Sequence, residues 1–167
     1  YDTAFLTAAA KRVAFAHWST PQAKKPDEIV WHEGSATQPI ARLPGDRLIG
    51  LSADGRRAAV VDDQAFIVHD LEHNTELCRI DSSRLADLYV AAGALSPDGG
   101  KLVVSDSNVQ KLWLFSVDAC KAQPKLLRGP GKNEADTLVF SPDSKPVAVG
   151  GAFYDRTVRV FATDSGR

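Results

Sequence analysis

The sequence predicts an all-β fold, a partial β-propeller of four-stranded antiparallel blades with about four blades, the last one incomplete. Residues 51–61, 93–106 and 140–149 resemble one another, and in each a short turn separates two runs rich in Val, Ala and Leu. Their turn serines are Ser52, Ser96 and Ser141, so the repeat steps are 44 and 45 residues. A period near 45 residues, with strands inside each unit, is typical of propeller repeats.

The clearest copy of the repeat predicts a strand, a tight turn and a second strand. Its turn reads Ser96-Pro97-Asp98-Gly99. Proline presets φ at the second turn position, the Asp98 side chain can bond back to the backbone, and Gly99 tolerates a positive φ. Residues 6–15 repeat the pattern one step before Ser52, without its turn residues.

Taken in order, the repeats predict blades at residues 3–45, 46–82, 89–131 and 135–167. Turn and loop residues separate the apolar runs, and residues 19–27 form a loop too long for a tight hairpin. The last blade lacks a fourth strand. The expected strands are 4–8, 12–18, 28–32 and 39–43; 47–52, 58–62, 65–70 and 76–80; 89–96, 101–105, 111–117 and 124–127; and 137–141, 146–150 and 157–163.

Two stretches carry a resemblance to a known repeat family. Residues 63–71 and 155–167 resemble the third strand and following turn of a WD40 repeat, and His69-Asp70 stands in the Trp-Asp position. Asp63 and Asp155 match the family's hairpin aspartate, but the Gly-His pair that normally partners it is absent. The family's buried Asp-His-Ser-Trp network is therefore incomplete here. The Ser-Pro-Asp-Gly turns also resemble, more weakly, those of TolB-like and peptidase-associated propellers.

The resemblance implies a ring larger than four blades, because WD40-like propellers usually close with seven. An open arc would expose an apolar sheet face at each end. We therefore expect further blades or a partner protein to cover the ends, and favour further blades. The absence of methionine, even at position 1, also suggests a piece of a longer protein.

Composition is that of a globular protein. The net charge of −1 provides no global attraction to nucleic acid or anionic membranes, and no apolar run approaches the length of a bilayer span. Cys78 and Cys120 fall in different repeats without metal-type spacing. We expect two buried thiols in a reducing compartment, with a disulfide as the alternative, and hence an intracellular protein in the cytoplasm or nucleus.

Motifs for catalysis, metals and phosphate binding are missing. The sequence has no His-Glu-x-x-His, Cys-x-x-Cys, Gly-rich phosphate loop or Gly-x-Ser-x-Gly. The three repeated serines occur in register, which favours a turn role over catalysis. His69 and His73 are expected at a strand end and a turn rather than as a shared metal site. We therefore predict no cofactor, no metal and no enzymatic activity in this chain.

Charged loops are the remaining candidates for partner contacts. Basic residues recur near equivalent turns and would form a basic rim on one side of the propeller, while a second group lies in the first-blade loop. The candidate contact residues are Lys24, Lys25 and Asp27 in the loop and Arg56, Arg57, Lys101 and Lys145 on the rim.

The function favoured by these observations is a WD40-like, non-catalytic scaffold for protein–protein interaction in a larger multisubunit complex, including a ribonucleoprotein complex. Stiff stacked sheets hold loops in fixed positions whatever the loop sequences are. The alternative is a propeller module of an enzyme or TolB-like periplasmic protein, such as the gating domain of a serine peptidase. A third alternative is an RNA-contacting subunit that uses the basic rim.

Overall fold

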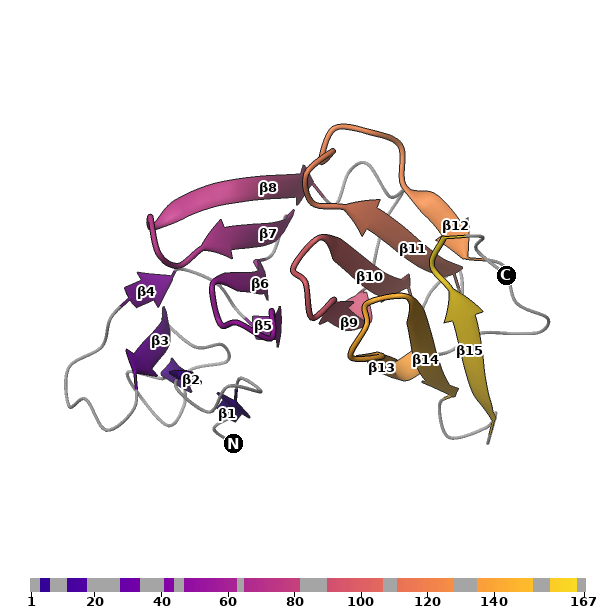
Figure 1. The fold of residues 1–167 in the computed structure, drawn as a ribbon, viewed down its shortest axis with the longest axis horizontal. Coiled ribbons are helices and arrows are strands. Elements are labelled where there is room, and N and C mark those ends of the chain that lie inside the picture. Colours follow the sequence, from indigo (N-terminus) through magenta and orange to yellow (C-terminus); the bar gives the residue numbers. More distant parts are fainter. Residues whose placement is uncertain are drawn as a thin grey trace.

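The computed structural model describes residues 4–6, 12–17, 28–33, 41–43, 47–62, 65–81, 90–106, 111–127, 135–151 and 157–164. These residues form strands and turns arranged as four antiparallel sheets, which lie side by side in chain order as an arc (Figure 1). Neighbouring strands in each sheet are also neighbours in sequence. None of the described segments is a helix that could cross a membrane. The partial-propeller fold predicted from the repeat period is confirmed.

Within the described residues, the first three sheets have four strands each and the fourth sheet has three. The predicted strand ends agree with the observed ones to within about two residues, the usual uncertainty of strand ends. The strands are β1 (Ala4–Leu6), β2 (Arg12–His17), β3 (Glu28–Glu33) and β4 (Ala41–Leu43) in the first sheet; β5 (Arg47–Leu51), β6 (Arg57–Val61), β7 (Ala65–Asp70) and β8 (Thr75–Asp81) in the second; β9 (Val90–Leu95), β10 (Lys101–Asp106), β11 (Lys111–Ser116) and β12 (Lys125–Leu127) in the third; and β13 (Ala135–Phe140), β14 (Pro146–Gly151) and β15 (Val158–Ala162) in the fourth.

Apolar side chains fill the spaces between successive sheets. The sequence of β10 is a continuous apolar run because both faces of this strand are covered. Leu102 and Val104 pack toward the second sheet, and Val103 packs toward the fourth. All three side chains are fully buried. A sheet covered on both faces needs apolar residues on both. The aromatic side chains of Phe66, Trp113, Phe115 and Phe161 also pack between the sheets.

The second and third sheets approach most closely at their first strands. A Cβ atom on Gly93 of β9 would overlap the Ile49 side chain, and one on Gly50 of β5 would lie 2.9 Å from the Leu95 backbone nitrogen. Only glycine leaves room for this contact. The two glycines therefore set the spacing of these sheets at one end of the packed core.

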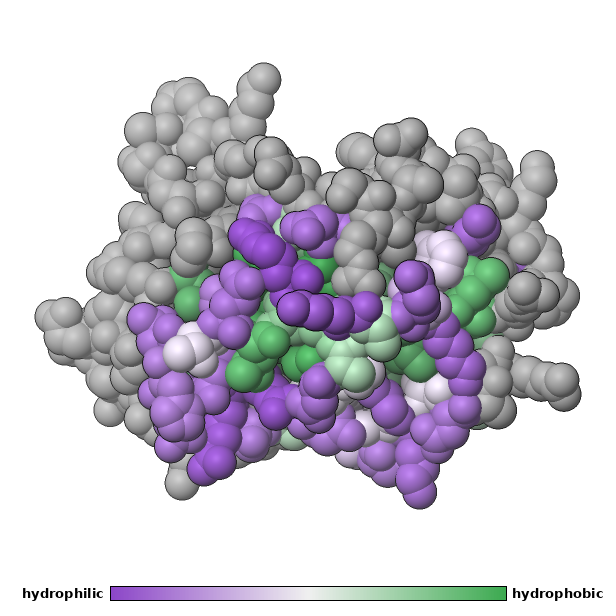
Figure 2. All heavy atoms as spheres, turned by 90° about the horizontal axis from the view of Figure 1, so that it is seen from above, coloured by the Kyte–Doolittle hydropathy of each residue, from purple (hydrophilic) through white to green (hydrophobic). Residues whose placement is uncertain are grey.

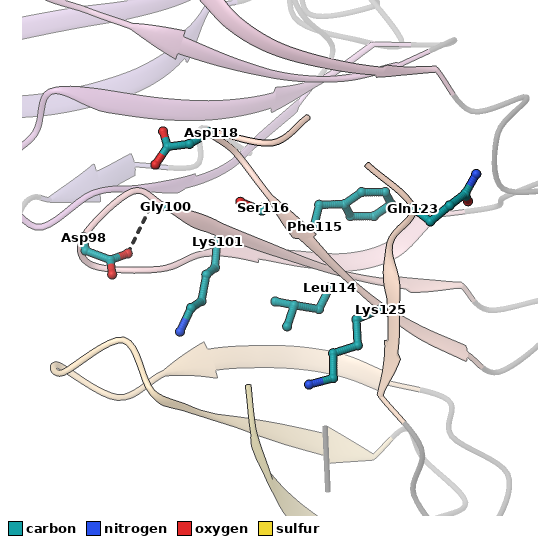
Figure 3. A pocket seen from close by; sticks show the side chains of 9 residues that line it. All are labelled: Asp98, Gly100, Lys101, Leu114, Phe115, Ser116, Asp118, Gln123 and Lys125. Carbon is teal, nitrogen blue, oxygen red and sulfur yellow. Dashed lines mark hydrogen bonds between the residues drawn. The ribbon is translucent and has the colours of Figure 1, made fainter. Parts of the chain in front are cut away.

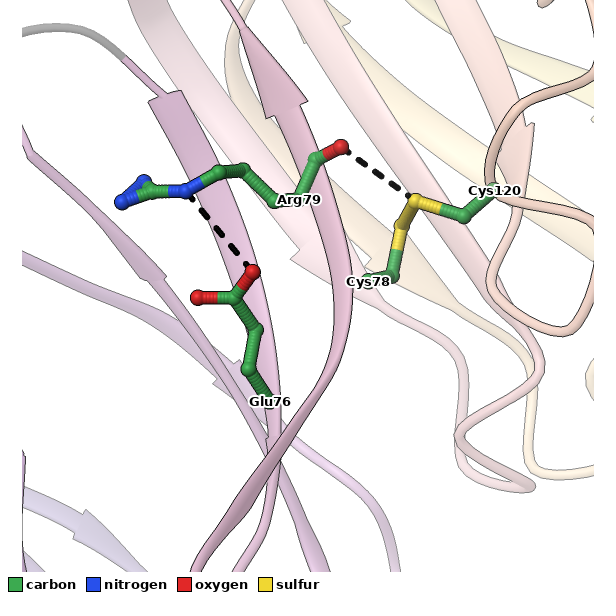
Figure 4. Close-up of a disulfide and its surroundings, with 4 residues drawn as sticks. All are labelled: Glu76, Cys78, Arg79 and Cys120. Carbon is green, nitrogen blue, oxygen red and sulfur yellow. Dashed lines mark hydrogen bonds and ion pairs between the residues drawn. A yellow bond between two sulfur atoms is a disulfide. The ribbon is translucent and has the colours of Figure 1, made fainter.

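A disulfide joins the second and third sheets, and the expectation of two buried thiols is wrong. Cys78 of β8 is bonded to Cys120 in the turn between β11 and β12, with 5.4 Å between their Cα atoms (Figure 4). The sulfur of Cys120 also lies 3.4 Å from the carbonyl oxygen of Arg79. The two cysteines are 42 residues apart, slightly less than one repeat, so stacking of the two sheets brings them together.

Candidate functional site

The repeated turn is closed by its own serine and aspartate. In the second sheet the Ser52 hydroxyl donates to the Asp54 carboxylate at 2.6 Å, and accepts from the Arg57 amide at 2.9 Å. The Ser96 hydroxyl makes the same pair of contacts with Asp98 and Lys101. These bonds require the residue types that recur with the repeat. The predicted turn role of the serines is confirmed.

The fourth position of the turn adopts a left-handed conformation. Gly55 and Gly99 have φ of 69° and 71°, and Ser144, which replaces glycine in the fourth sheet, has φ of 60°. Glycine adopts this region at little cost, whereas serine is strained there. Ser144 is nonetheless buried, and its hydroxyl accepts a hydrogen bond from the Asp98 amide of the third sheet at 3.0 Å. The serine thus ties two neighbouring turns together.

Hydrogen bonds keep the turn carboxylates ionised. Partial burial alone would raise the pKa of Asp98, but donation from the Ser96 hydroxyl and the Gly100 amide outweighs this and lowers it. The pKa of Asp54 is lowered by the same balance. In Asp143, bonding from the Ser141 hydroxyl is the largest cause of a lowered pKa. A carboxylate with a lowered pKa is a poor general acid near neutral pH.

In the second and third sheets, the basic residue that begins the second strand, β6 or β10, reaches across to the next sheet. The Arg57 guanidinium donates to the Gly99 carbonyl oxygen at 3.1 Å and lies 3.3 Å from the Asp118 carboxylate. Both acceptors belong to the third sheet and its turns. This contact therefore joins the second sheet to the third.

Lys101 repeats the contact one sheet further on. Its ammonium donates to the Ser144 carbonyl oxygen at 3.0 Å and to the Thr163 hydroxyl at 2.9 Å, and it lies 3.3 Å from Asp164. Ser144 occupies the turn position of Gly99, and Asp164 the position of Asp118. We call the Arg57 and Lys101 contacts the inter-sheet ties. They are equivalent in sequence and in geometry.

A groove lies beside the Lys101 tie, with a volume of about 420 Å³. Figure 3 shows the Lys101 and Lys125 side chains extending toward the fourth sheet. Lys125 donates to the carbonyl oxygens of Thr163 and Asp164. Both lysines are thus held by the turn that follows β15. The groove is lined by Asp98, Gly100, Lys101, Leu114, Phe115, Ser116, Asp118, Gln123 and Lys125.

The predicted rim residues are placed in two different environments. The side chains of Arg57 and Lys101 are 31% and 27% exposed and form the inter-sheet ties. Arg56 and Lys145, one position earlier in the repeat, are exposed, and Arg56 pairs with Glu72 at 3.4 Å. Polar side chains surround apolar ones on the face seen in Figure 2. The first-blade loop residues Lys24, Lys25 and Asp27, like Asp63 and Asp155, lie outside the described residues.

The histidines of the second sheet do not share a site. His69 is buried and its pKa is lowered by burial, whereas the exposed His73 ring bonds the Asp70 carboxylate at 2.8 Å. This bond raises the pKa of His73 and lowers that of Asp70 to about 2. Among the described residues no three His, Cys, Asp or Glu side chains cluster as metal ligands would.

Sequence reasoning missed the acidic partners of the ties. Asp118 and Asp164 each follow a third-strand phenylalanine by three residues, at Phe115 and Phe161. This spacing from the phenylalanine to the aspartate, together with the basic residue that begins the second strand, could have indicated the acidic partners from the sequence. Lys125 has no equivalent residue that would have pointed to it.

Comparison with known proteins supports the fold alone. No protein-family profile and no curated protein matches the sequence. Among solved structures, the Cps50 (Swd1) β-propeller domain of Myceliophteria thermophila is similar, with a TM-score of 0.74 at 10% identity over 100% of this chain. Kuenenia stuttgartiensis hydrazine synthase gives 0.66 at 13% identity over 97%. The dihydro-heme d1 dehydrogenase NirN, in complex with DHE, gives 0.65 at 20% identity over 99%.

The chain spans about half or less of the chains to which it is similar. It covers 53% of the Swd1 propeller chain, 46% of the hydrazine synthase chain and 35% of NirN. Two of the three are named as enzymes and one as a propeller domain. At these identities the likeness extends to the arrangement of sheets and not to any particular site.

Proposed function

We propose that this chain is a non-catalytic propeller scaffold that holds protein partners of a larger multisubunit complex. The supporting observation is that the repeated polar residues form structural hydrogen bonds within the turns and between the sheets. Serine and aspartate close the turns, and Arg57 and Lys101 tie one sheet to the next. Residues committed to these bonds stiffen the arc, and a stiff arc presents its loops in fixed positions.

The groove beside Lys101 is the contact surface that we favour. Leu114 and Phe115 line the groove but are buried in the packing between sheets, so its accessible lining is chiefly polar, with exposed groups such as Ser116 and Gln123. A polar, solvent-accessible lining resembles the rim of a protein–protein contact. A partner segment that carries hydrogen-bond donors and acceptors would fit this groove.

The test is recovery of stoichiometric partners from the native source by the tagged chain. Ser116→Arg and Gln123→Arg would fill the groove with bulk and charge, while Thr75→Arg places the same change on the exposed β8. We expect both groove variants to lose a partner that the wild type and Thr75→Arg retain. Equal recovery by all four proteins would exclude the groove, and absence of any stoichiometric partner would count against a scaffold.

A module of an extracytoplasmic enzyme is the second candidate, and the disulfide favours it. Disulfides persist in oxidising compartments and are rare in the cytosol and nucleus. The Cys78–Cys120 bond therefore speaks against the intracellular placement expected from the sequence. Intact mass of the protein from its source, with and without reduction before alkylation, would show whether the disulfide is present there. Two alkylated thiols in the unreduced sample would restore the intracellular reading.

An RNA-contacting role has less support from the geometry. Two of the four basic rim residues, Arg57 and Lys101, are bound to the neighbouring sheet, which leaves Arg56 and Lys145 at the surface. Phosphate contacts make affinity fall steeply with salt. Binding of single-stranded RNA that weakens between low and physiological salt, and further in Arg56→Glu with Lys145→Glu, would favour this role. Salt-independent or absent binding would exclude it.

A further inference from the structure

The turn between β11 and β12 forms part of the wall of the groove. It covers residues 117–124, and its Asp118 and Gln123 line the groove. Val117, at the start of the turn, is 3% exposed and belongs to the core between the second and third sheets. From Asp118 to Gln123, by contrast, every residue except Cys120 is exposed. The core therefore holds the start of the turn, and contacts other than core packing hold its tip.

The tip of this turn is joined to the second sheet by the disulfide and by an ion pair. Arg57 and Asp118 are 3.3 Å apart, but the Asp118 side chain is 76% exposed. Solvent screens an ion pair this exposed, so the pair holds the turn only weakly. The disulfide connects Cys120 to Cys78, which is 2% exposed within the core (Figure 4). The disulfide is therefore the stronger of these two links.

We propose that the disulfide is a redox-controlled latch on the groove: its reduction releases the tip of the β11–β12 turn while the sheets stay stacked. The stacking persists because buried side chains of both sheets form the core between them, among them Phe66, Ile80, Leu102 and Phe115. These apolar contacts do not pass through the bond. After reduction, the Cys78 thiol would remain in the core as a small apolar side chain.

The two sulfur atoms differ in their access to a reductant. Cys120 is half-buried in a turn of exposed residues, whereas Cys78 is buried on β8. A thiolate of a dithiol reductant therefore attacks the Cys120 sulfur and forms a mixed disulfide with it. The electron pair of the broken bond leaves on the Cys78 sulfur, which takes up a proton. The second thiol of the reductant then displaces the Cys120 thiolate, which is protonated in turn, and the reductant becomes a disulfide.

Release of the turn changes the groove. Asp118 and Gln123 would lose their fixed positions, so the groove would keep this wall only in the oxidised protein. Because disulfides persist in oxidising compartments and are kept reduced in the cytosol, the compartment would set the state of the latch. The effect on a partner rests on the proposed function, whereas the release of the turn does not.

The experiment is hydrogen exchange of the folded protein, followed by NMR, before and after treatment with dithiothreitol, a dithiol reductant. We expect exchange within residues 117–124 to become faster by about tenfold, because the turn then opens locally. The Ala122 amide, which donates to the Ala119 carbonyl oxygen at 2.9 Å, reports from inside the turn. The turn at residues 141–146, which contains no cysteine, should exchange at an unchanged rate.

Two variants separate the bond from the ion pair. Cys120→Ser removes the bond and leaves the buried Cys78 in place, so its turn should exchange as fast as in the reduced wild type and should not respond to reductant. Asp118→Asn removes the Arg57 ion pair and keeps the disulfide, so its turn should stay slow until reductant is added. Alkylation of the reduced, folded wild type should label Cys120 faster than Cys78.

Three results would overturn the proposal. Unchanged exchange of the turn, once mass spectrometry shows the bond to be broken, would mean that other contacts hold it. Loss of the far-ultraviolet circular dichroism of the sheets on reduction would make the bond a requirement of the whole fold instead of a latch. Equal release of the turn in Asp118→Asn, with the disulfide intact, would assign its position to the ion pair.

Partner recovery by the tagged chain is a separate readout. A partner that the oxidised protein retains and that Cys120→Ser and the reduced protein lose would extend the latch to partner binding. Absence of any partner in both states would count against the proposed function, and the exchange of the turn would still decide the latch.

Discussion

Removing the Cys78–Cys120 disulfide should destabilise the protein more than any other single covalent or side-chain change considered. The bond closes a loop of 42 residues between the second and third sheets. A cross-link of this loop length reduces the entropy of the unfolded chain, and the chain-entropy relation gives about 4 kcal/mol at 25 °C. For a chain of 167 residues this corresponds to a fall in Tm of about 10 °C.

The measurement is thermal and urea unfolding of the wild type and of Cys78→Ala with Cys120→Ala, each with and without a thiol reductant. Reductant should lower the Tm of the wild type to near that of the double variant, and leave the variant unchanged. The variant supplies the control for any general effect of the reductant. Cys78 is only 2% exposed, so its replacement also removes some packing, and the reduced wild type isolates the effect of the bond.

A wild-type Tm that does not respond to reductant would refute this reasoning, provided that mass spectrometry shows the bond to be broken. Stacking of the second and third sheets would then be set by the apolar contacts and the Arg57 tie alone. Failure of the two thiols to pair under oxidising conditions would refute the placement of β8 against the β11–β12 turn.

Three further predictions concern the ties, the turns and pH. Lys101→Ala removes charge-assisted bonds between the third and fourth sheets and should lower the free energy of unfolding by about 1–2 kcal/mol in urea titrations, whereas Lys101→Arg should restore part of it. Gly99→Ala imposes a side chain at φ 71° and 2.5 Å from the Arg57 Cδ atom, so we expect a loss of about 1–2 kcal/mol, with a normal stability contradicting the turn geometry. The Asp70–His73 pair should stabilise the fold most at mildly acidic pH. The Asp70 pKa is lowered to about 2, so its contribution to stability is present above the unfolded pKa of aspartate and is lost as the pH falls through about 2. The His73 pKa is raised, so its contribution is present below the unfolded histidine pKa of about 6.5 and is lost as the pH rises through the folded pKa. In Asp70→Asn the His73 pKa, followed by NMR, should fall toward the ordinary value for histidine, and an unchanged pKa would exclude the pair in solution.

The fold could be predicted because its signal is local and repeated. A turn such as Ser96 to Gly99 closes through its own side chains, so the residue types that it needs stand next to one another in the sequence. The turn fixes the pairing register of the strands on either side. Three copies at nearly constant spacing then identify a stack of similar sheets. The fourth-sheet copy, with Ser144 at the left-handed position, shows that the period carries the prediction even where one residue departs from it.

Contacts between sheets could not be predicted in the same way, because they depend on how far one sheet is offset from the next. The basic residues Arg57 and Lys101 were identified as a rim, yet their acceptors lie 42 or more positions away. The two cysteines occupy non-equivalent positions in their repeats, so the period gave no reason to pair them. Their spacing is meaningful only once the second sheet is stacked on the third.

The ties also explain why the end of the arc differs from its interior. Arg57 and Lys101 are the first residues of β6 and β10, and the corresponding first residue of β14 is Pro146. Proline has no side-chain donor, so at this position the fourth sheet has no equivalent of the Arg57 and Lys101 side chains that tie the second sheet to the third and the third to the fourth. On the face of the fourth sheet turned away from the third, Val139, Val158 and Val160 are exposed. Attraction between such apolar side chains and a covering surface is a force without direction, unlike the hydrogen bonds of the ties.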